Sequence, residues 1–178
     1  MKITVITSSP KKYGTTALLT QEFINGAKEV GHEIFRFDSA FNRIAACTAC
    51  DYCKDNDGNC VFNDGMNKLY LELMKTDCIV FVTPLYYFGF SAQLKAVIDR
   101  FYAINDKLQA KEIKSILLAS AADDEDSAVK ALQLHYETIV SFMKWQNIGM
   151  LFALGCSEKA DILKSDYPEK AYLLGNSL

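Results

Sequence analysis

Four cysteines stand close together in the sequence, at Cys47, Cys50, Cys53 and Cys60. A spacing of three places the first three thiolates around a tight turn, where they can converge on one polynuclear centre while the fourth arrives from a short excursion. Iron–sulfur clusters use this arrangement, although the x3-Cys-Pro ending of bacterial ferredoxins is missing here. One zinc ion with four thiolate ligands also fits the count. The third interpretation is a set of metal-free thiols, structural or redox-active, at a contact between subunits.

A second candidate for chemistry is the hydroxyl-rich loop between a predicted strand at residues 2–7 and a predicted helix at 17–30. Unpaired N–H groups at a helix start, the positive end of the helix dipole and nearby hydroxyls together favour a phosphate. The hydroxyls belong to Ser8, Ser9, Thr15 and Thr16. The loop contains neither GxxxxGK[ST] nor GxGxxG, so it carries no nucleotide motif. A plain Ser/Thr-rich turn before a capped helix is the alternative.

A third candidate is the segment DCIVFVTPLYYFGFSAQLKAVIDR, residues 77–100. Its apolar, β-branched run at 78–82 predicts a buried parallel strand that ends at Pro84, and Ser91 is a good N-cap for the helix that follows. Between them, four aromatic rings in five positions indicate a surface that holds a flat, apolar group. Alternatively these rings pack against another subunit, a role most easily given to Phe88 and Phe90.

The remaining elements alternate between strand and helix. Predicted strands lie at 33–38, 113–120 and 148–154, and predicted helices lie at 64–76, from about 125 to 144, and at 168–174. Such alternation implies an α/β fold with a five-stranded parallel sheet and helices on both faces. The loops at 8–16, 84–90 and 120–124 then follow strand ends, where doubly wound sheets bind ligands. Strand order 2-1-3-4-5 places the phosphate site beside the aromatic slot, so one ligand with a phosphate and a flat ring satisfies both.

Length and charge narrow the class of protein. The 178 residues are enough for a single domain, with a cysteine-rich loop at about 39–65 that lacks periodicity. A net charge of −3 without clustered Lys and Arg argues against a nucleic-acid surface. The absence of a long apolar run and of a secretory leader predicts a cytoplasmic protein with no membrane span. In that compartment, cysteines are more often thiols, metal ligands or redox groups than disulfides.

Several motifs resemble one known family, the NAD(P)H-dependent FMN reductases and multimeric flavodoxins. The segment SSPKKYGTTALL is similar to the family's phosphate loop, and TPLYYFGFSAQLKAVIDR to its isoalloxazine-binding loop and the next helix. The segment CTACDYCKDNDGNCVFNDGM resembles its cysteine segment, and MKWQNIGMLFALGCSEKADI its fifth strand. The cysteine spacing is most similar to that of the iron–sulfur flavoproteins, which carry a 4Fe-4S cluster beside FMN and usually form dimers or tetramers. The resemblance implies a flavodoxin-like doubly wound sheet.

The resemblance also implies roles for individual residues. The FMN phosphate would be held by Ser9, Lys11, Thr15 and Thr16. The ring would be wrapped by Pro84, Leu85, Tyr86, Tyr87, Phe88 and Gly89, with Ser120 at its other edge. The cluster ligands would be Cys47, Cys50, Cys53 and Cys60. The chain departs from the family pattern at Ser8 and at Ala121-Ala122, where Gly is usual or frequent, and at Thr15, where Asn is common. The alanine Cβ atoms hinder close approach of the backbone beside Ser120 to the flavin.

These implications predict an FMN-dependent oxidoreductase that passes electrons from NADH or NADPH to an acceptor, by way of a 4Fe-4S cluster if the cysteines hold one. No protein residue is assigned a catalytic role, because the cofactor carries the chemistry and the protein supplies position and electrostatics. The alternative is a flavin electron carrier without its own nicotinamide site. A zinc-stapled interaction module is the third class.

Overall fold

The computed structural model describes residues 1–178 and contains one five-stranded sheet in which every neighbouring pair of strands is parallel. The strands are β1 (Lys2–Thr7), β2 (Glu33–Asp38), β3 (Cys78–Pro84), β4 (Lys114–Ser120) and β5 (Gln146–Ala153). Their order is β2-β1-β3-β4-β5, which confirms the predicted topology. The order reverses between β1 and β3, and in such sheets the reversal point opens a crevice at the carboxyl ends of the strands.

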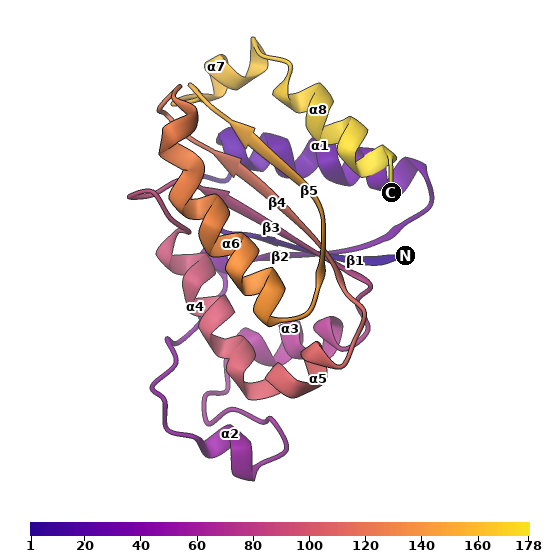
Figure 1. Ribbon diagram of the computed structural model, residues 1–178, viewed down its shortest axis with the longest axis vertical. Helices are drawn as coiled ribbons and strands as arrows, with labels where there is room; N and C mark the ends of the chain where they lie inside the picture. Colours follow the sequence, from indigo (N-terminus) through magenta and orange to yellow (C-terminus); the bar gives the residue numbers. More distant parts are fainter.

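Helices cover both faces of the sheet (Figure 1). They are α1 (Thr15–Glu29), α2 (Tyr52–Asp55), α3 (Met66–Leu73), α4 (Ala92–Arg100), α5 (Asn105–Gln109), α6 (Lys130–Phe142), α7 (Lys159–Leu163) and α8 (Tyr167–Asn176). Short 3-10 turns lie at Ser39–Phe41, Phe101–Ile104 and Asp126–Val129. Helices α1, α7 and α8 pack on one face, and α3, α4, α5 and α6 pack on the other. The two helical layers therefore bury two separate apolar cores.

Strand β3 is the centre of the sheet, and all of its side chains are buried. Its residue Phe81 is surrounded by aromatic rings, with ring centroids 6.3 Å from Phe90 and 6.5 Å from Trp145. Phe90 is only 9% exposed and belongs to this core. The alternative that Phe90 packs against another subunit is therefore wrong, because its ring is buried in the core of its own chain.

Helix α1 begins at Thr15, two residues earlier than predicted, which places two threonines in its first turn. The sequence did not predict α5, α7 or the single turn of α2, because five residues or fewer show no helical periodicity. Strand β5 begins at Gln146 rather than at 148, with a register shift opposite Ser115 and Ile116.

Helices α1 and α8 cross at two glycines. A Cβ on Gly26 would lie 2.0 Å from the carbonyl oxygen of Tyr172, and a Cβ on Gly175 would lie 2.2 Å from that of Phe23. These approaches leave room for hydrogen only, so the close packing of the two helices requires both glycines. None of the helices is both long and apolar enough to cross a bilayer.

Candidate functional site

A cleft of about 540 Å³ lies at the carboxyl ends of β1, β3 and β4. This volume is within the usual range for small-molecule and cofactor sites. Eight of the predicted flavin-binding residues line it: Ser9, Lys11, Thr15, Thr16, Pro84, Leu85, Tyr86 and Ser120. The structure therefore brings the loops after three different strands into one site, as the rule for doubly wound sheets requires.

One end of the cleft is the start of α1, which has no internal cap. The N-cap is Gly14, no side chain accepts a hydrogen bond there, and the first turn has no acidic residue. The amides of Thr15, Thr16 and Ala17 donate to no backbone carbonyl. Free amides and the positive end of a helix dipole attract an anion. This end of the cleft is thus suited to a phosphate group.

Ser120 lies at the same end and connects β4 to α1. Its Oγ is 3.0 Å from Thr15 Oγ1 and 2.9 Å from Thr16 Oγ1, and the side chains of Thr16 and Ser120 are almost fully buried. The next residue, Ala121, donates its amide to Ala153 O and accepts from the amide of Cys156. The backbone of Ala121 is therefore occupied by neighbouring protein groups, and the Ser120 hydroxyl is directed at the first turn of α1.

The hydroxyl of Ser8 does not belong to the cleft, contrary to the prediction that it contributes to the phosphate site. Ser8 is fully buried, donates from Oγ to Val82 O at 3.2 Å and accepts from Ser91 Oγ at 2.8 Å. Ser91 also caps α4 by accepting from the amide of Leu94. Ser8 therefore joins the end of β1 to β3 and α4, and its role is structural.

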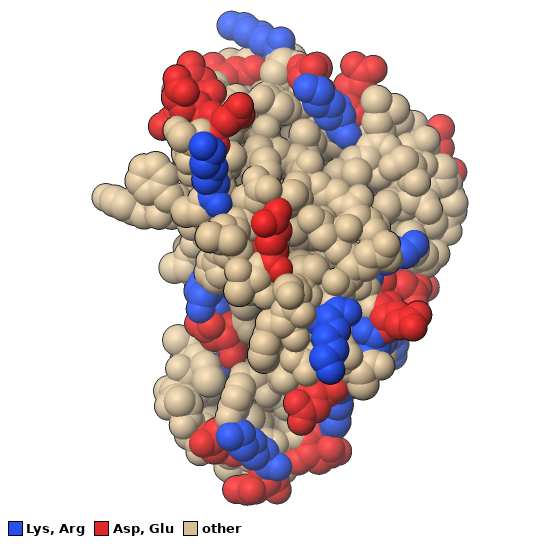
Figure 2. All heavy atoms as spheres, in the orientation of Figure 1, with Lys and Arg blue, Asp and Glu red and all other residues tan.

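The aromatic loop after β3 is divided between the cleft and solvent. Tyr86 and Gly89 exchange both backbone hydrogen bonds, at 3.3 and 3.1 Å, so the loop closes as a two-residue turn. Tyr87 and Phe88 form its tip with φ of 45° and 62°, and they are 101% and 58% exposed. The loop projects from the surface (Figures 1 and 2). Of the six residues predicted to wrap a ring, Pro84, Leu85 and Tyr86 line the cleft, whereas Tyr87, Phe88 and Gly89 do not.

Part of the cleft wall was not predicted from the sequence. The additional lining residues are Lys12, Tyr13, Gly14, Ala122, Cys156, Ser157, Glu158 and Lys159. Residues 156–159 follow β5, so the rule that ligands bind beyond strand ends could have identified them. Lys12 and Lys159 add positive charge to the end of the cleft formed by α1.

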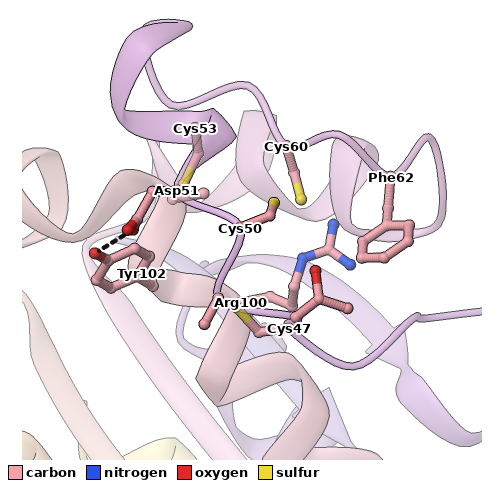
Figure 3. Close-up of a pocket in the computed structure, with 11 residues that line it drawn as sticks. Cys47, Cys50, Asp51, Cys53, Cys60, Phe62, Arg100 and Tyr102 are labelled. Carbon is pink, nitrogen blue, oxygen red and sulfur yellow. Dashed lines mark hydrogen bonds between the residues drawn. The ribbon is translucent and has the colours of Figure 1, made fainter.

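The four clustered cysteines line a separate small pocket at the far end of the molecule, near α2 (Figures 1 and 3). Cys47 and Cys50 are exposed, and Cys53 and Cys60 are partly buried. No three Cys, His, Asp or Glu side chains of the chain are arranged to hold a metal ion. The loop thus gathers four thiols around one pocket without a preformed coordination geometry.

The backbone of this cysteine loop is held in an uncommon conformation. Ala49 and Asp51 have φ of 52° and 55°, and the amides of residues 47–51 donate to no backbone carbonyl. Successive free amides around left-handed residues form concavities that bind anions, including iron–sulfur groups. The amide of Tyr52 and then the Thr48 side chain lower the pKa of Cys50. Burial, in contrast, raises the pKa of the Cys53 thiol, so the loop favours thiolate charge at Cys50 and not at every cysteine.

Two side-chain contacts hold the loop against the α4–α5 region. Tyr102 Oη donates to Asp51 at 2.8 Å, the dashed contact of Figure 3, and Lys107 Nζ donates to Asp57 at 2.7 Å. Both contacts are exposed, so each stabilises the loop only modestly.

On its inner side the loop is held by a buried ion pair. Arg100 Nη1 lies 2.9 Å from Asp64 Oδ2 and donates to Ala45 O at 2.9 Å. Burial raises the pKa of Asp64, but the amide of Ala45 and the Arg100 guanidinium outweigh burial and hold that pKa below its usual value. Asp64 is therefore an ionised partner at neutral pH.

A sequence model of the family described as NADPH-dependent FMN reductase matches residues 1–158. The chain belongs to this family. The predicted family is thereby confirmed. The match spans β1 to β5 and includes the cysteine loop and every residue that lines the cleft except Lys159.

Within the FMN reductase family, the chain is similar to proteins named iron–sulfur flavoproteins. It is 30% identical over 155 residues to the iron-sulfur flavoprotein of Methanosarcina thermophila, covering 87% of this chain and 78% of that protein. It is 34% identical over 100 residues to iron-sulfur flavoprotein MJ1083 of Methanocaldococcus jannaschii, covering 56% of this chain. That match spans about half, 51%, of the relative's length.

Solved structures share the fold. The NAD(P)H:quinone oxidoreductase from Methanothermobacter marburgensis has a TM-score of 0.77 at 15% identity, covering 99% of this chain and 95% of that chain. A flavone reductase has a TM-score of 0.75 at 21% identity, covering 99% and 61% of the two chains. At these identities the similarity shows a shared fold and no more.

Proposed function

We propose that the chain binds FMN in the 540 Å³ cleft, accepts electrons from NADH or NADPH, and passes them to an acceptor. One observation carries the proposal: the cleft joins an uncapped helix start at one end to Pro84, Leu85 and Tyr86 at the other. If this site holds FMN, the cofactor would supply two-electron chemistry, taking a hydride equivalent from the nicotinamide and returning two electrons to the acceptor.

The protein's part is to bind and orient the cofactor. The free amides of Thr15, Thr16 and Ala17 and the side chains of Ser9 and Lys11 supply donors for a phosphate. Ser120 fixes the two threonine hydroxyls, so the first turn of α1 is rigid before FMN arrives. Preorganised donors cost less to order on binding, which increases affinity.

The other end of the cleft positions the ring. Pro84 is fixed in β3 and buried, while Tyr86 is 41% exposed beside it. An apolar edge and an exposed aromatic side chain suit one face of a flat ring and leave room for a nicotinamide. No side chain is assigned a proton-transfer step.

We also propose that Cys47, Cys50, Cys53 and Cys60 hold a 4Fe-4S cluster. The support is their shared pocket, the free amides of residues 47–51, and the iron–sulfur flavoproteins among the relatives. Thiolate ligands and hydrogen bonds to sulfur are what such clusters require. Binding requires the thiols to turn inward from their present positions around the pocket. Zinc and metal-free thiols are the competing outcomes of the test below.

The assembly proposed is one domain over residues 1–178 in a homodimer or homotetramer, acting in the cytoplasm. Exposed Tyr87 and Phe88 rings support a subunit contact, since aromatic residues are enriched at interfaces. Six free cysteines fit a reducing compartment.

A pair of neighbouring variants tests the flavin site. Tyr86→Ala removes a ring that lines the cleft, whereas Tyr87→Ala removes one that lies outside the cleft. Titration of apoprotein with FMN, followed by flavin fluorescence, is expected to show weaker binding for the first variant only. In holoprotein, flavin bands near ~370 and ~450 nm should bleach with NADH or NADPH. Equal loss in both variants contradicts the site, and bound FMN without bleaching favours an electron carrier.

Metal analysis of anaerobically purified protein tests the cysteine site. Iron and acid-labile sulfide are expected in the wild type and in Cys78→Ala, whose thiol lies in the opposite core, but not in Cys60→Ser. Zinc without iron, or equal iron in both variants, would refute the cluster.

A further inference from the structure

Arg100 is the most buried charged side chain beside the cysteine pocket. It ends α4, is 1% exposed and lines the pocket together with the four cysteines. Figure 3 shows its guanidinium directed toward Cys60 and Phe62, with the guanidinium carbon 5.2 Å from the centre of the Phe62 ring. A full positive charge therefore stands at the wall of the pocket.

The hydrogen-bond partners around Arg100 are Asp64, Ala45 and the Tyr70 hydroxyl, which donates to Arg100 O at 2.8 Å. Nη1 is bound by Asp64 and Ala45 O, and Nη2 lies 3.4 Å from Asp64 Oδ1. The Nε–H group is buried and has no acceptor. A purely structural role, in which Arg100 pins the loop through Asp64, explains the Nη contacts and leaves Nε unexplained. A buried N–H without an acceptor is costly, so the pocket itself is the place to look for the missing partner.

We propose that Arg100 is the charge-compensating residue of the cysteine site, and that its Nε–H and positive charge stabilise the reduced form of a thiolate-bound cluster. This inference rests on the proposed 4Fe-4S cluster. Uptake of one electron adds one negative charge to the group, and no proton need move because a guanidinium stays protonated. Net charge and hydrogen bonds to sulfur are the levers that set the potential of such clusters.

Variants of Asp64 serve as a control, because its negative charge opposes the positive charge of Arg100. Asp64→Asn removes the neutralising carboxylate and leaves the Arg100 charge in place. Arg100→Gln combined with Asp64→Asn removes both charges and the Nε–H together. The readouts are iron content, circular dichroism, and the midpoint potential from a dithionite titration followed by electron paramagnetic resonance.

The single and the double variant are expected to differ in midpoint potential, because only the single variant keeps the Arg100 charge. Asp64→Asn makes the cluster easier to reduce than in the wild type, and the double variant makes it harder to reduce than in Asp64→Asn. At a fixed potential the reduced-to-oxidised ratios of these two variants should differ at least tenfold, about 59 mV for a one-electron couple. Equal potentials in these two variants, or a lower potential in Asp64→Asn than in the double variant, at full iron content overturn the inference and support a structural role only.

Two further variants keep the test decisive if the double variant does not fold. Arg100→Lys retains a buried charge without Nε–H, and its potential should fall below that of the wild type. Lys107→Gln removes an exposed charge that is bound to Asp57 near the same loop, and it should leave the potential unchanged. If Lys107→Gln shifts the midpoint potential from the wild-type value as much as Arg100→Lys does, the inference is overturned. Absence of iron from the wild type refutes the cluster itself and this inference with it.

Discussion

Gly14 offers a direct test of the anion site at the start of α1, because it is the N-cap of a helix that has no capping side chain. Its φ of −82° and ψ of −172° are extended and open to any residue. An added Cβ would meet Lys11 Cβ at 3.1 Å, a contact that a shift of a few tenths of an ångström in the exposed loop at Lys11 relieves. Gly14→Asp therefore places a carboxylate over the free amides with little strain.

The substitution should have opposite effects on stability and on FMN affinity. An Asp cap improves on Gly by a few tenths of a kcal/mol, and its charge adds about 0.5 kcal/mol at the helix dipole. The apoprotein should therefore gain roughly 2 °C in Tm. The bound phosphate loses an amide worth about 1.5 kcal/mol and meets a like charge. Repulsion at about 4 Å is about 4 kcal/mol at a dielectric constant near 20, and roughly half that in an open cleft.

The expected loss in FMN binding is thus about 3.5 kcal/mol, or roughly 300-fold in Kd. Fluorescence titration of apoprotein with FMN measures it, and riboflavin, which lacks the phosphate, is the matched ligand control. Gly14→Asn caps the helix without a charge and should lose less affinity. If Gly14→Asp weakens riboflavin as much as FMN, or leaves FMN binding unchanged, the phosphate does not sit at the start of α1.

Three further outcomes test other parts of the structure. Arg100→Met leaves the buried Asp64 carboxylate unpaired and should lower the free energy of unfolding in urea by about 3–5 kcal/mol. Lys95→Met, which breaks an exposed pair, should cost less than about 0.5 kcal/mol. Although burial raises the pKa of Asp64, its amide and Arg100 partners hold it below the ordinary value, so wild-type stability should fall as pH drops below about 4. Asp64→Asn should lack that pH-dependent step. Gly26→Ala forces a Cβ into the backbone of α8 and should cost about 1–3 kcal/mol, whereas Asn25→Ala, on the exposed side of α1, should be near neutral.

For each of these predictions, one result would contradict it. Equal losses for Arg100→Met and Lys95→Met would mean that the buried pair is not formed in solution. A pH profile for Asp64→Asn that matches the wild type would assign the acid transition to other carboxylates. A neutral Gly26→Ala would show that α1 and α8 pack less closely than described.

The strand order and the position of the cleft could be predicted from the sequence because both depend on long patterns. The apolar run of β3 and the alternation of strands with helices leave few topologies, and loops after strands then meet at one edge. What could not be predicted depends on side-chain direction. Ser8 and Ser9 are adjacent hydroxyls in one loop, yet Ser8 points into the core and Ser9 lines the cleft.

The aromatic turn shows the same limit. Positive φ at two consecutive positions normally signals Asn-Gly, so nothing in Tyr87-Phe88 predicts a turn that directs both rings away from the cleft. Arg100 was missed for a different reason. A charged residue at a helix end is expected to be exposed, and only the tertiary structure shows that Asp64 makes its burial possible.

Helix α4 runs from the end of the sheet that bears the cleft to the cysteine pocket, and it is anchored at both ends. Its first end is fixed in the core at the carboxyl ends of β1 and β3, where Ser91 is hydrogen-bonded to Ser8 and Thr83, and its last residue, Arg100, lines the cysteine pocket. Nine helical residues span about 13 Å. The helix therefore holds Ser91 and Arg100 at a fixed separation, so that a change in its length would move the cysteine pocket relative to the end of β3.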